Sequence, residues 1–441
     1  MSKPVVALVG RPNVGKSSLF NRLIRKKVAI VDDMPGVTRD RNYAETQWGG
    51  RDFMLVDTGG YVARSEEGVD GAVRDQAQQA IGEADLVLFL VDAQTGIVDL
   101  DAEVARILQR GNRKSLLVVN KVDRMDQVGD MAPFYRLGLG DPVPVSAVTG
   151  LNSGDLLDEL VALLPEEEPD EEAVEDEIGI ALVGRPNVGK SSLLNKFVRE
   201  ERAVVDDVPG TTRDAIDTLF EHEGQRVRLI DTAGVHRRSK KEIGVGFYAF
   251  VRTLRALERC DVALVMLDAS EGIYEQDKRI VAEAIQLGKG VVLVANKWDL
   301  VEKDSKTMNL YLEALRERMP FAEFAPTLFT SALTGQRVTK ALDIAIKVAE
   351  ERGKRVPTHA LNVFLEDTQL EFPPPKVRGR DVRGLYVTQR RVAPPTFVFF
   401  FNRPEGIPAT YLRYLERRLR ETFGFEGAPI RIETKGRKER K

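Results

Sequence analysis

The chain has 441 residues, of which 43% are hydrophobic and 30% charged, and its formal net charge is -3. This composition is typical of a globular protein of about three domains, and no apolar run approaches the roughly 18 residues that a membrane-spanning helix requires. Residues 1–4 lead directly into a strand-like run and leave no room for a signal peptide, so we expect a cytoplasmic protein. The single cysteine, Cys260, excludes an intramolecular disulfide framework and an all-cysteine metal site. Within "ERCDVALVM" we interpret it as a small packed residue.

Short apolar runs alternate with helical patterns along the first 164 residues. Strands are predicted at residues 4–10, 51–57, 84–92, 114–120 and 141–147, and helical stretches at 76–84 and 100–110. Continuous apolar strands separated by helices indicate a mostly parallel sheet covered on both faces. Such a sheet binds its ligand at the carboxyl ends of its strands, which is where the motifs below fall.

The sequence contains a long internal repeat. "ALVGRPNVGKSSL" occurs at residues 7–19 and again at 181–193, an offset of 174. Four further motifs recur at similar offsets: "PGVTRD" (35–40) as "PGTTRD" (209–214), "DTGG" (57–60) as "DTAG" (231–234), "NKVD" (120–123) as "NKWD" (296–299), and "SA" (146–147) as "SA" (331–332). The chain is therefore predicted to hold two copies of one domain.

Composition sets the expected boundaries. Nine of residues 165–177 are acidic, which predicts a flexible linker over 165–178 between a first domain (1–164) and a second domain (179–352). Residues 352–441 carry 20 Lys plus Arg against 10 Asp plus Glu, so this region is strongly basic and the rest of the chain is acidic. A basic C-terminal domain (353–441) on an acidic body indicates a polyanionic partner.

Residues 10–17 match the pattern GxxxxGK[ST], follow a strand and open a helix. The glycines let successive backbone N–H groups and the helix N-terminus face a β-phosphate. Lys16 is expected to reach the β- and γ-oxygens and Ser17 to bind Mg²⁺. Lys190 and Ser191 repeat these roles in residues 184–191.

The motif NKxD identifies the base. The carboxylate of Asp123 can accept both N1–H and N2–H of guanine, while Asn120 contacts the other edge; adenine offers no such pair of donors. Asn296 and Asp299 repeat this arrangement, and the "SA" pairs suit a backbone N–H directed at guanine O6. The predicted ligands are therefore GTP and GDP.

The two DxxG motifs each end an apolar strand. Asp57 and Asp231 are predicted to hold a Mg²⁺-bound water, and Gly60 and Gly234 to contact the γ-phosphate through their backbone. Thr38 and Thr212, the threonines common to both copies, are assigned to complete Mg²⁺ coordination when GTP is bound, which would give an order–disorder switch.

The complete predicted sites follow from these motifs. The predicted nucleotide-binding residues of the first copy are Gly10, Arg11, Pro12, Asn13, Val14, Gly15, Lys16, Ser17, Ser18, Asp57, Gly60, Asn120, Lys121, Asp123, Ser146 and Ala147. Those of the second copy are Gly184, Arg185, Pro186, Asn187, Val188, Gly189, Lys190, Ser191, Ser192, Asp231, Gly234, Asn296, Lys297, Asp299, Ser331 and Ala332. The predicted catalytic residues are Lys16, Thr38, Asp57, Gly60, Lys190, Thr212, Asp231 and Gly234, and the predicted Mg²⁺ ligands are Ser17, Thr38, Asp57, Ser191, Thr212 and Asp231.

This constellation resembles that of Ras-like GTPases of the translation-factor class. Two such P-loop domains in tandem, an acidic linker and a small basic C-terminal domain resemble the bacterial EngA/Der double-GTPase family over essentially the whole chain. The resemblance implies an α/β protein with two Ras-like GTPase domains followed by a KH-like domain. It also implies a GTPase that binds the large ribosomal subunit and acts late in its assembly; we expect a monomer with no membrane partner.

The chain departs from the Ras pattern after each DxxG. Tyr61 and Val235 stand where Ras-like enzymes carry the glutamine that orients water, so intrinsic hydrolysis is expected to be slow. The family implies that a K⁺ ion supplies the missing positive charge, held in part by Asn13 and Asn187; the alternative, that each asparagine only satisfies a tight turn, stays open. His236 is interpreted as a solvated switch residue, because the first copy has valine there.

The C-terminal region is predicted as a KH-like layer. A helix over residues 360–375 stopped by prolines is followed by strands at 384–392 and 396–402, a helix at 409–423 and a strand at 428–434. Phe397, Phe399 and Phe401 alternate, but apolar Val398 and Phe400 favour a central strand buried on both faces over a base-stacking platform.

Two sequence features bear on RNA binding by this region. The only GxxG, residues 424–427, lies between a helix and a strand and is not expected to clamp RNA. Contact with rRNA is assigned instead to a basic set, with a merely solubilising basic surface as the alternative: Arg378, Arg380, Arg383, Arg390, Arg391 and the tail 435–441.

Two other functional classes are alternatives to this interpretation. The first is a binding scaffold whose domains hold GTP or GDP without useful turnover; the intact lysines, DxxG and NKxD motifs argue against it. The second is a membrane-remodelling GTPase, which the absence of an amphipathic or transmembrane element in the sequence disfavours.

Overall fold

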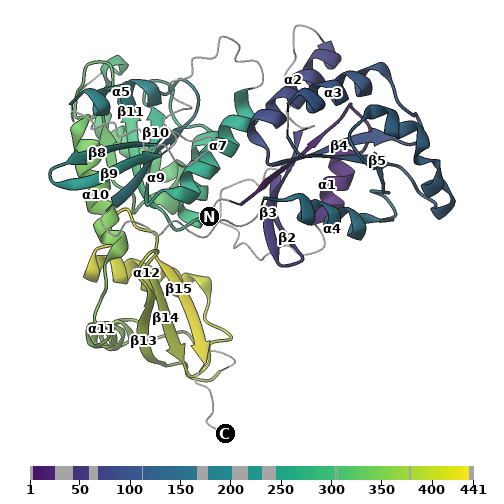
Figure 1. The fold of residues 1–441 in the computed structure, drawn as a ribbon. Helices are drawn as coiled ribbons and strands as arrows, with labels where there is room; N and C mark the ends of the chain where they lie inside the picture. Colours follow the sequence, from purple (N-terminus) through teal and green to yellow (C-terminus); the bar gives the residue numbers. More distant parts are fainter. Residues whose placement is uncertain are drawn as a thin grey trace. The chain divides into compact units, whose positions relative to one another are not determined.

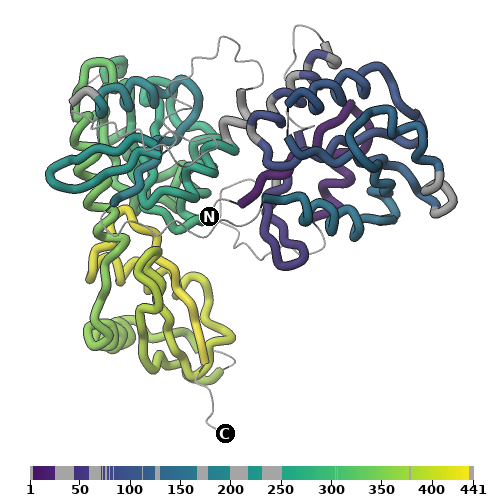
Figure 2. Tube along the Cα trace, in the orientation of Figure 1, coloured from purple at the N-terminus to yellow at the C-terminus, as the bar shows by residue number. Residues whose placement is uncertain are grey.

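The computed structural model describes residues 3–24, 43–58, 68–111, 113–165, 177–200, 217–230, 245–302, 304, 306–376 and 379–436. These residues form three β-sheets, each with its own helices (Figure 1), and the Cα trace shows the same path (Figure 2). The first sheet belongs to one compact unit, whereas the second and third sheets share another. Within the described ranges no helix has the length and apolar character needed to cross a bilayer.

The first sheet has six strands in the order β2-β3-β1-β4-β5-β6, with β2 antiparallel to β3 and all other neighbours parallel. Its strands are β1 (Val5–Val9), β2 (Tyr43–Trp48), β3 (Arg51–Asp57), β4 (Leu86–Asp92), β5 (Ser115–Asn120) and β6 (Val143–Pro144). Its helices are α1 (Lys16–Ile24), α2 (Gly68–Glu83), α3 (Asp99–Arg110), the 3₁₀ segment η2 (Met125–Leu137) and α4 (Ser153–Leu163).

The core of this sheet explains why its central strands are apolar throughout. Every residue of β1 and β4 is buried. Leu19 and Leu23 of α1 and Leu157 of α4 pack against one face of the sheet, in the same cluster as Leu8 and Leu88. Helix α2 contacts β1 as well. Strands buried on both faces cannot alternate polar and apolar residues, as predicted from the sequence.

The second sheet repeats the first. Its order is β8-β9-β7-β10-β11-β12, with β8 antiparallel to β9 and the others parallel, so each strand takes the place of its counterpart in the first sheet. Its strands are β7 (Glu177–Gly184), β8 (Thr218–His222), β9 (Gln225–Ile230), β10 (Val262–Asp268), β11 (Gly290–Asn296) and β12 (Thr327–Phe329). Residues 190–353 contain, in chain order, the helical segments α5 (Lys190–Glu200), α7 (Val245–Arg259), α8 (Glu275–Gln286), η3 (Trp298–Leu300), α9 (Thr307–Arg318), η4 (Pro320–Ala322) and α10 (Thr339–Gly353); most of α7 groups with the unit of the first sheet.

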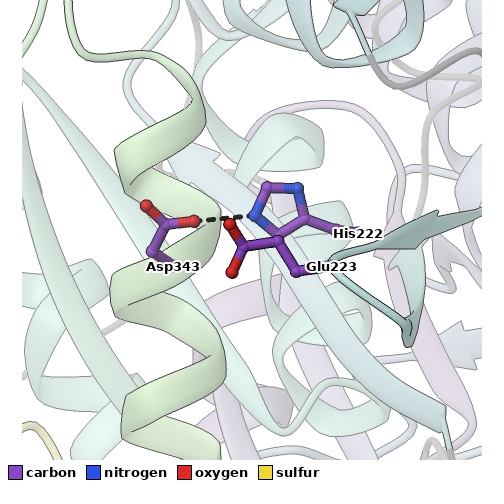
Figure 3. A group of neighbouring side chains, drawn as sticks. All are labelled: His222, Glu223 and Asp343. Carbon is purple, nitrogen blue, oxygen red and sulfur yellow. Dashed lines mark hydrogen bonds and ion pairs between the residues drawn. The ribbon is translucent and has the colours of Figure 1, made fainter.

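Two side-chain environments stand out in the second sheet. Cys260 is 1% exposed, and burial raises the pKa of its thiol to about 12, which confirms a packed, unreactive cysteine. At the tip of the β8–β9 hairpin, His222 Nε2 donates a hydrogen bond of 2.7 Å to Asp343 on α10, and Glu223 lies beside the pair (Figure 3). The buried imidazole thus ties the hairpin to α10.

The third sheet has the order β13-β14-β15, with β13 antiparallel and β15 parallel to the central strand. Its elements are α11 (Thr358–Glu371), β13 (Gly384–Arg391), β14 (Thr396–Phe401), α12 (Ala409–Phe423) and β15 (Arg431–Gly436), in the order predicted from the sequence. Phe397, Phe399 and Phe401 are fully buried in a cluster with residues of α11 and α12. The prediction of a strand buried on both faces holds for Val398, which is 3% exposed, but Phe400 is partly exposed.

The GxxG segment joins the second and third sheets. Gly427 N–H donates to Phe324 O (2.9 Å), and Val291 N–H, in strand β11, donates to Gly427 O (2.8 Å). Phe425 N–H donates to a carboxylate oxygen of Glu351 on α10 (2.6 Å). The backbone of this loop is therefore hydrogen-bonded to the second domain, in keeping with the expectation that it does not clamp RNA.

Candidate nucleotide-binding sites

The loop between β1 and α1 approaches its neighbours so closely that two positions accept only glycine. A Cβ atom on Gly10 would lie 2.4 Å from Leu90 O, and one on Gly15 would lie 2.3 Å from Asn120 Nδ2. Gly15 also has a φ of +95°, which L-residues rarely adopt. The equivalent glycines of the second copy, Gly184 and Gly189, make equally close approaches to β10 and to Asn296.

The loop lysines fold back over the loop. Lys16 Nζ donates to the carbonyl oxygens of Gly10 (2.6 Å) and Arg11 (3.0 Å). Lys190 Nζ repeats both hydrogen bonds in the second copy. Burial lowers the pKa of both ammonium groups, and that of Lys190 falls to about 8. Each ammonium group is thus desolvated and held at the loop, where an anionic ligand would find it already oriented.

The structure brings together two of the predicted Mg²⁺ ligands of the first copy. Ser17 Oγ, in the first turn of α1, donates to Asp57 Oδ2 at the end of β3 over 2.5 Å, and Asp57 is 1% exposed. A hydroxyl and a carboxylate at the mouth of a phosphate loop fit Mg²⁺, which prefers oxygen ligands and keeps several waters.

The NKxD asparagines hold the phosphate loop to the "SA" loop in each copy. Asn120 Nδ2 donates to Val14 O (2.7 Å), and its Oδ1 accepts from Ala147 N–H (3.0 Å). Asn296 makes the same two hydrogen bonds to Val188 O (2.8 Å) and Ala332 N–H (2.9 Å). Both amides are buried, so each asparagine connects three motifs that lie far apart in the sequence. This positioning role was not predicted; contact of Asn120 with guanine stays a prediction.

The predicted base-recognition residues gather beside this asparagine in the first copy. Ser146 Oγ donates to Asp123 Oδ1 (2.6 Å) and also accepts from Thr149 N–H, which orients the carboxylate. Lys121, with a φ of +68°, forms an ion pair with Asp92 over 2.7 Å.

The second copy repeats part of this arrangement. Ser331 Oγ accepts from Thr334 N–H, and Lys297, with a φ of +59°, pairs with Asp268 over 2.5 Å. Burial opposes the charged form of Asp268, yet its hydrogen bonds with Lys297 and Ser270 outweigh burial and lower the pKa of the carboxyl.

The arginine of each phosphate loop forms an ion pair that was not predicted from the sequence. Arg11 Nε lies 3.3 Å from Asp101 Oδ2, and Arg185 Nε lies 2.9 Å from Asp277 Oδ1. The two aspartates are almost completely buried in the first turns of α3 and α8, and burial raises the pKa of both carboxyls. The sequence does indicate this pair, because the aspartate follows the arginine at nearly the same distance in both copies. The distance is 90 residues in the first copy and 92 in the second.

The loop asparagines proposed to hold K⁺ have left-handed backbones. The φ angles of Asn13 and Asn187 are +67° and +63°, a conformation that asparagine tolerates better than most residues. The left-handed turn therefore explains the presence of asparagine at each of these two positions without a bound ion.

Some of the predicted residues lie outside the described residues: Thr38, Gly60, Tyr61, Thr212, Asp231, Gly234, Val235, His236, Arg378, most of the linker and the tail beyond residue 436.

Comparison with known proteins identifies the family that these two sites belong to. A model described as "50S ribosome-binding GTPase" matches residues 5–121 and again residues 179–297. A second, described as "KH-domain-like of EngA bacterial GTPase enzymes, C-terminal", matches residues 355–435. The chain belongs to the GTPase Der (EngA) family. It is thus a member of a family of 50S ribosome-binding GTPases involved in ribosome assembly.

The likeness to curated Der proteins covers nearly the whole chain. The GTPase Der of Desulforamulus reducens is 53% identical over 432 residues, 98% of each chain, and that of Moorella thermoacetica is 52% identical with the same coverage. The GTPase Der of Caldanaerobacter subterraneus is 49% identical over 440 residues, 100% of each chain. A Der GTPase hydrolyses GTP, and its P-loop family binds the nucleotide with Mg²⁺.

Proposed function

We propose that both copies bind and hydrolyse GTP, and that their nucleotide states together control how the basic C-terminal domain contacts the large ribosomal subunit. The observation that carries this proposal is the repeated asparagine link. Asn120 and Asn296 each connect a phosphate loop to an "SA" loop through two hydrogen bonds of 2.7–3.0 Å. The same long-range connection in both copies supports guanine-nucleotide binding at both sites.

We propose that Ser17, Thr38 and Asp57 hold Mg²⁺ in the first copy, and Ser191, Thr212 and Asp231 in the second. The contact of Ser17 with Asp57 supports this assignment for the first copy. When bound, Mg²⁺ would neutralise charge on the β- and γ-phosphates. Lys16 and Lys190 would add a second positive charge to the same oxygens.

Slow intrinsic hydrolysis stimulated by K⁺ is also part of the proposal, with Asn13 and Asn187 contributing to the ion's site. The exposed position of both asparagines on the phosphate loop supports it, although their turn geometry alone would also explain them. Hydrolysis in 100–200 mM KCl should be at least about tenfold faster than in NaCl at the same ionic strength, because a preorganised charge at the transition state is worth one or more powers of ten. Equal rates would exclude the potassium site.

Contact with rRNA is assigned to the basic domain. Arg380, Arg383 and Arg391 are exposed, whereas Arg390 is paired with Glu433 at 2.9 Å and offers less net charge than expected from the sequence. Co-sedimentation with ribosomal subunits under GTP, GDP and a non-hydrolysable analogue tests the proposal. Binding should weaken with salt and should weaken further when residues 435–441 are deleted.

A scaffold that binds nucleotide without useful turnover is the alternative. Single-turnover hydrolysis by Lys16→Ala and Lys190→Ala variants separates the two functions and shows how the copies divide the work. Each variant should lose the activity of one site. A chain that binds GTP at both sites but hydrolyses it at neither would be a scaffold.

A further inference from the structure

The third sheet has one face covered by helices and one face that carries an exposed aromatic pair. Phe397, Phe399 and Phe401 point into the core between the sheet and helices α11 and α12. Alternation along β14 therefore directs Phe400 to the opposite, open face. There its ring stacks on that of Tyr386, with centroids 4.1 Å apart and planes 14° from parallel.

The strand register extends this pair into a row of three side chains. Phe400 is paired with Tyr386 on β13 and with Lys435 on β15. Tyr386 is 40% exposed and Lys435 is exposed as well. By this register the row presents two stacked rings followed by an ammonium group at one end of the sheet, whose strands β13, β14 and β15 are drawn in Figure 1.

The charge of the open face favours an anionic partner. Among the residues of the three strands, Glu433 is the only acidic one, and Arg390 reaches across β14 to pair with both of its carboxylate oxygens at 2.9 Å. This pair, at the level of Val398, neutralises the carboxylate and explains the burial of Val398. Because the Arg390–Glu433 pair is neutral overall, the ammonium group of Lys435 gives the row a net positive charge.

We propose that the open face of the third sheet, at Tyr386, Phe400 and Lys435, binds unpaired bases of single-stranded RNA. The rings offer a flat apolar surface on which a base can stack, and Lys435 lies where it can contact the adjacent phosphate. Double-stranded RNA does not fit this surface because its base faces are stacked on each other. The proposal rests on the RNA contact assigned above and specifies where that contact is made.

The position of the GxxG loop supports this location. A KH domain that clamps RNA uses the backbone of such a loop, but here Gly427 and Phe425 are hydrogen-bonded to the second domain. The aromatic row lies at the opposite end of β15 from Arg431, whose guanidinium group donates to Gln286 O of the second domain (2.6 Å). RNA recognition by this domain is therefore assigned to the sheet face and not to the loop.

The test measures binding of the full chain to a fluorescein-labelled A8 or U8 oligoribonucleotide and to an RNA hairpin by fluorescence anisotropy. Tyr386→Leu keeps the apolar bulk but removes the aromatic ring, and should weaken binding of the octamers about tenfold without changing the salt dependence. Tyr386→Phe should bind like the unaltered chain. Lys435→Gln should weaken binding and lower the slope of log K against log salt by about 0.7.

A matched control uses an apolar side chain elsewhere in the domain. Leu370 on α11 is 84% exposed, and Leu370→Ser should leave octamer affinity unchanged. Unchanged affinity in Tyr386→Leu, or preference of the unaltered chain for the hairpin, would overturn the proposal. Thermal melts of the variants show whether a loss of octamer affinity reflects unfolding. If Tyr386→Leu is unfolded, the octamer affinities of Tyr386→Phe and Lys435→Gln test the proposal instead.

Failure of this inference is distinguishable from failure of the proposed function. If the full chain sediments with the large subunit in a nucleotide-dependent manner while Tyr386→Leu binds the octamers normally, the proposed function stands and the sheet face is excluded. If Tyr386→Leu impairs only GTP hydrolysis and binds the octamers normally, the inference is wrong. A chain that binds neither octamers nor ribosomal subunits would contradict both.

Discussion

Arg185 in the second phosphate loop donates from Nε to Asp277 over 2.9 Å, although the two residues are 92 positions apart in the chain. The arginine is 13% exposed and the aspartate not at all. The guanidinium group also lies over the Tyr274 ring, 4.0 Å from its centroid, and Asp277 accepts a hydrogen bond from Tyr274 N–H. The start of α8 therefore holds one side of the phosphate loop, as the corresponding part of α3 does through Asp101 in the first copy.

Removing Asp277 should destabilise the second domain. Asp277→Ala leaves a largely buried guanidinium group without its main partner, and breaking a buried pair costs about 3 kcal/mol or more. The chain has two tryptophans, Trp48 in strand β2 of the first sheet and Trp298 in η3 of the second domain. Urea unfolding followed by fluorescence in a Trp48→Phe background therefore reports on the second domain.

Glu271 supplies the control for this prediction. It also pairs with Arg185, at 3.3 Å, but its side chain is 51% exposed. An exposed pair contributes at most about 1 kcal/mol, so Glu271→Gln should change stability little. Equal effects of the two substitutions would show that the buried pair is not what holds the loop.

Nucleotide binding by the second copy should weaken at alkaline pH. Burial lowers the pKa of Lys190 to about 8 in the free protein, so the ammonium group loses its proton as the pH rises through that value. A phosphate ligand requires the charged form, and binding must then take up a proton. Affinity for GDP should fall about fivefold from pH 8 to pH 9.

This prediction can be measured by titration calorimetry on a Lys16→Ala background, which leaves the second site to be observed. Heats measured in buffers of different ionisation enthalpy give the number of protons taken up. Lys190→Arg keeps its charge over the whole range, so its affinity should not depend on pH between 7 and 9. A flat profile in the protein with Lys190 would show that the lysine stays charged.

Guanine preference should depend on one carboxylate in each copy. Asp123, the proposed acceptor of guanine N1–H and N2–H, is held by Ser146 Oγ at 2.6 Å. Asp123→Asn replaces one acceptor oxygen by a donor, and a site built for a substrate N–H group loses several powers of ten in discrimination when that match is broken. Competition of GDP against XDP, with Asp299→Asn as the second-copy counterpart, measures the change; unaltered purine preference would contradict the assignment.

Much of the fold could be predicted because it depends on local patterns. Continuous apolar runs such as residues 86–92 become strands buried on both faces, and the repeated GxxxxGK[ST] motif has strand–loop–helix context in both copies. The antiparallel strand β2 was missed because "YAETQW" mixes polar and apolar residues, as an edge strand does.

The connections within the site were harder to predict, because they join residues that are distant in sequence. The motif assigned Asn120 to guanine, but no spacing rule shows that its amide also reaches Val14 O and Ala147 N–H. The motif assigned Arg11 to the nucleotide, which stays a prediction, but did not show that its Nε pairs with Asp101. A comparison of the two copies for equally spaced charged residues would have revealed this second relationship.

The junction between the second and third sheets should be sensitive to a single methyl group. Gly427 has a φ of +72°, and a Cβ atom there would lie 2.4 Å from Val348 Cγ2 and 3.1 Å from Val291 O. Left-handed backbone strain costs about 1–2 kcal/mol in a non-glycine residue, and overpacking adds a further 1–3 kcal/mol or so. Gly427→Ala should therefore loosen the hydrogen bonds that join this loop to strand β11 and Phe324.

Gly379 offers a control that separates strain from contact. Its φ is +74°, nearly the same as that of Gly427, but a Cβ atom there would meet no atom within 4 Å. Limited trypsin digestion measures opening of the junction, because Lys354 and Arg355 lie between α10 and α11 and Lys354 Nζ donates to Phe423 O at 2.7 Å. Cleavage there should accelerate strongly in Gly427→Ala and only slightly in Gly379→Ala. Similar cleavage rates in both variants would mean that the loop contact does not hold the third sheet against the second domain.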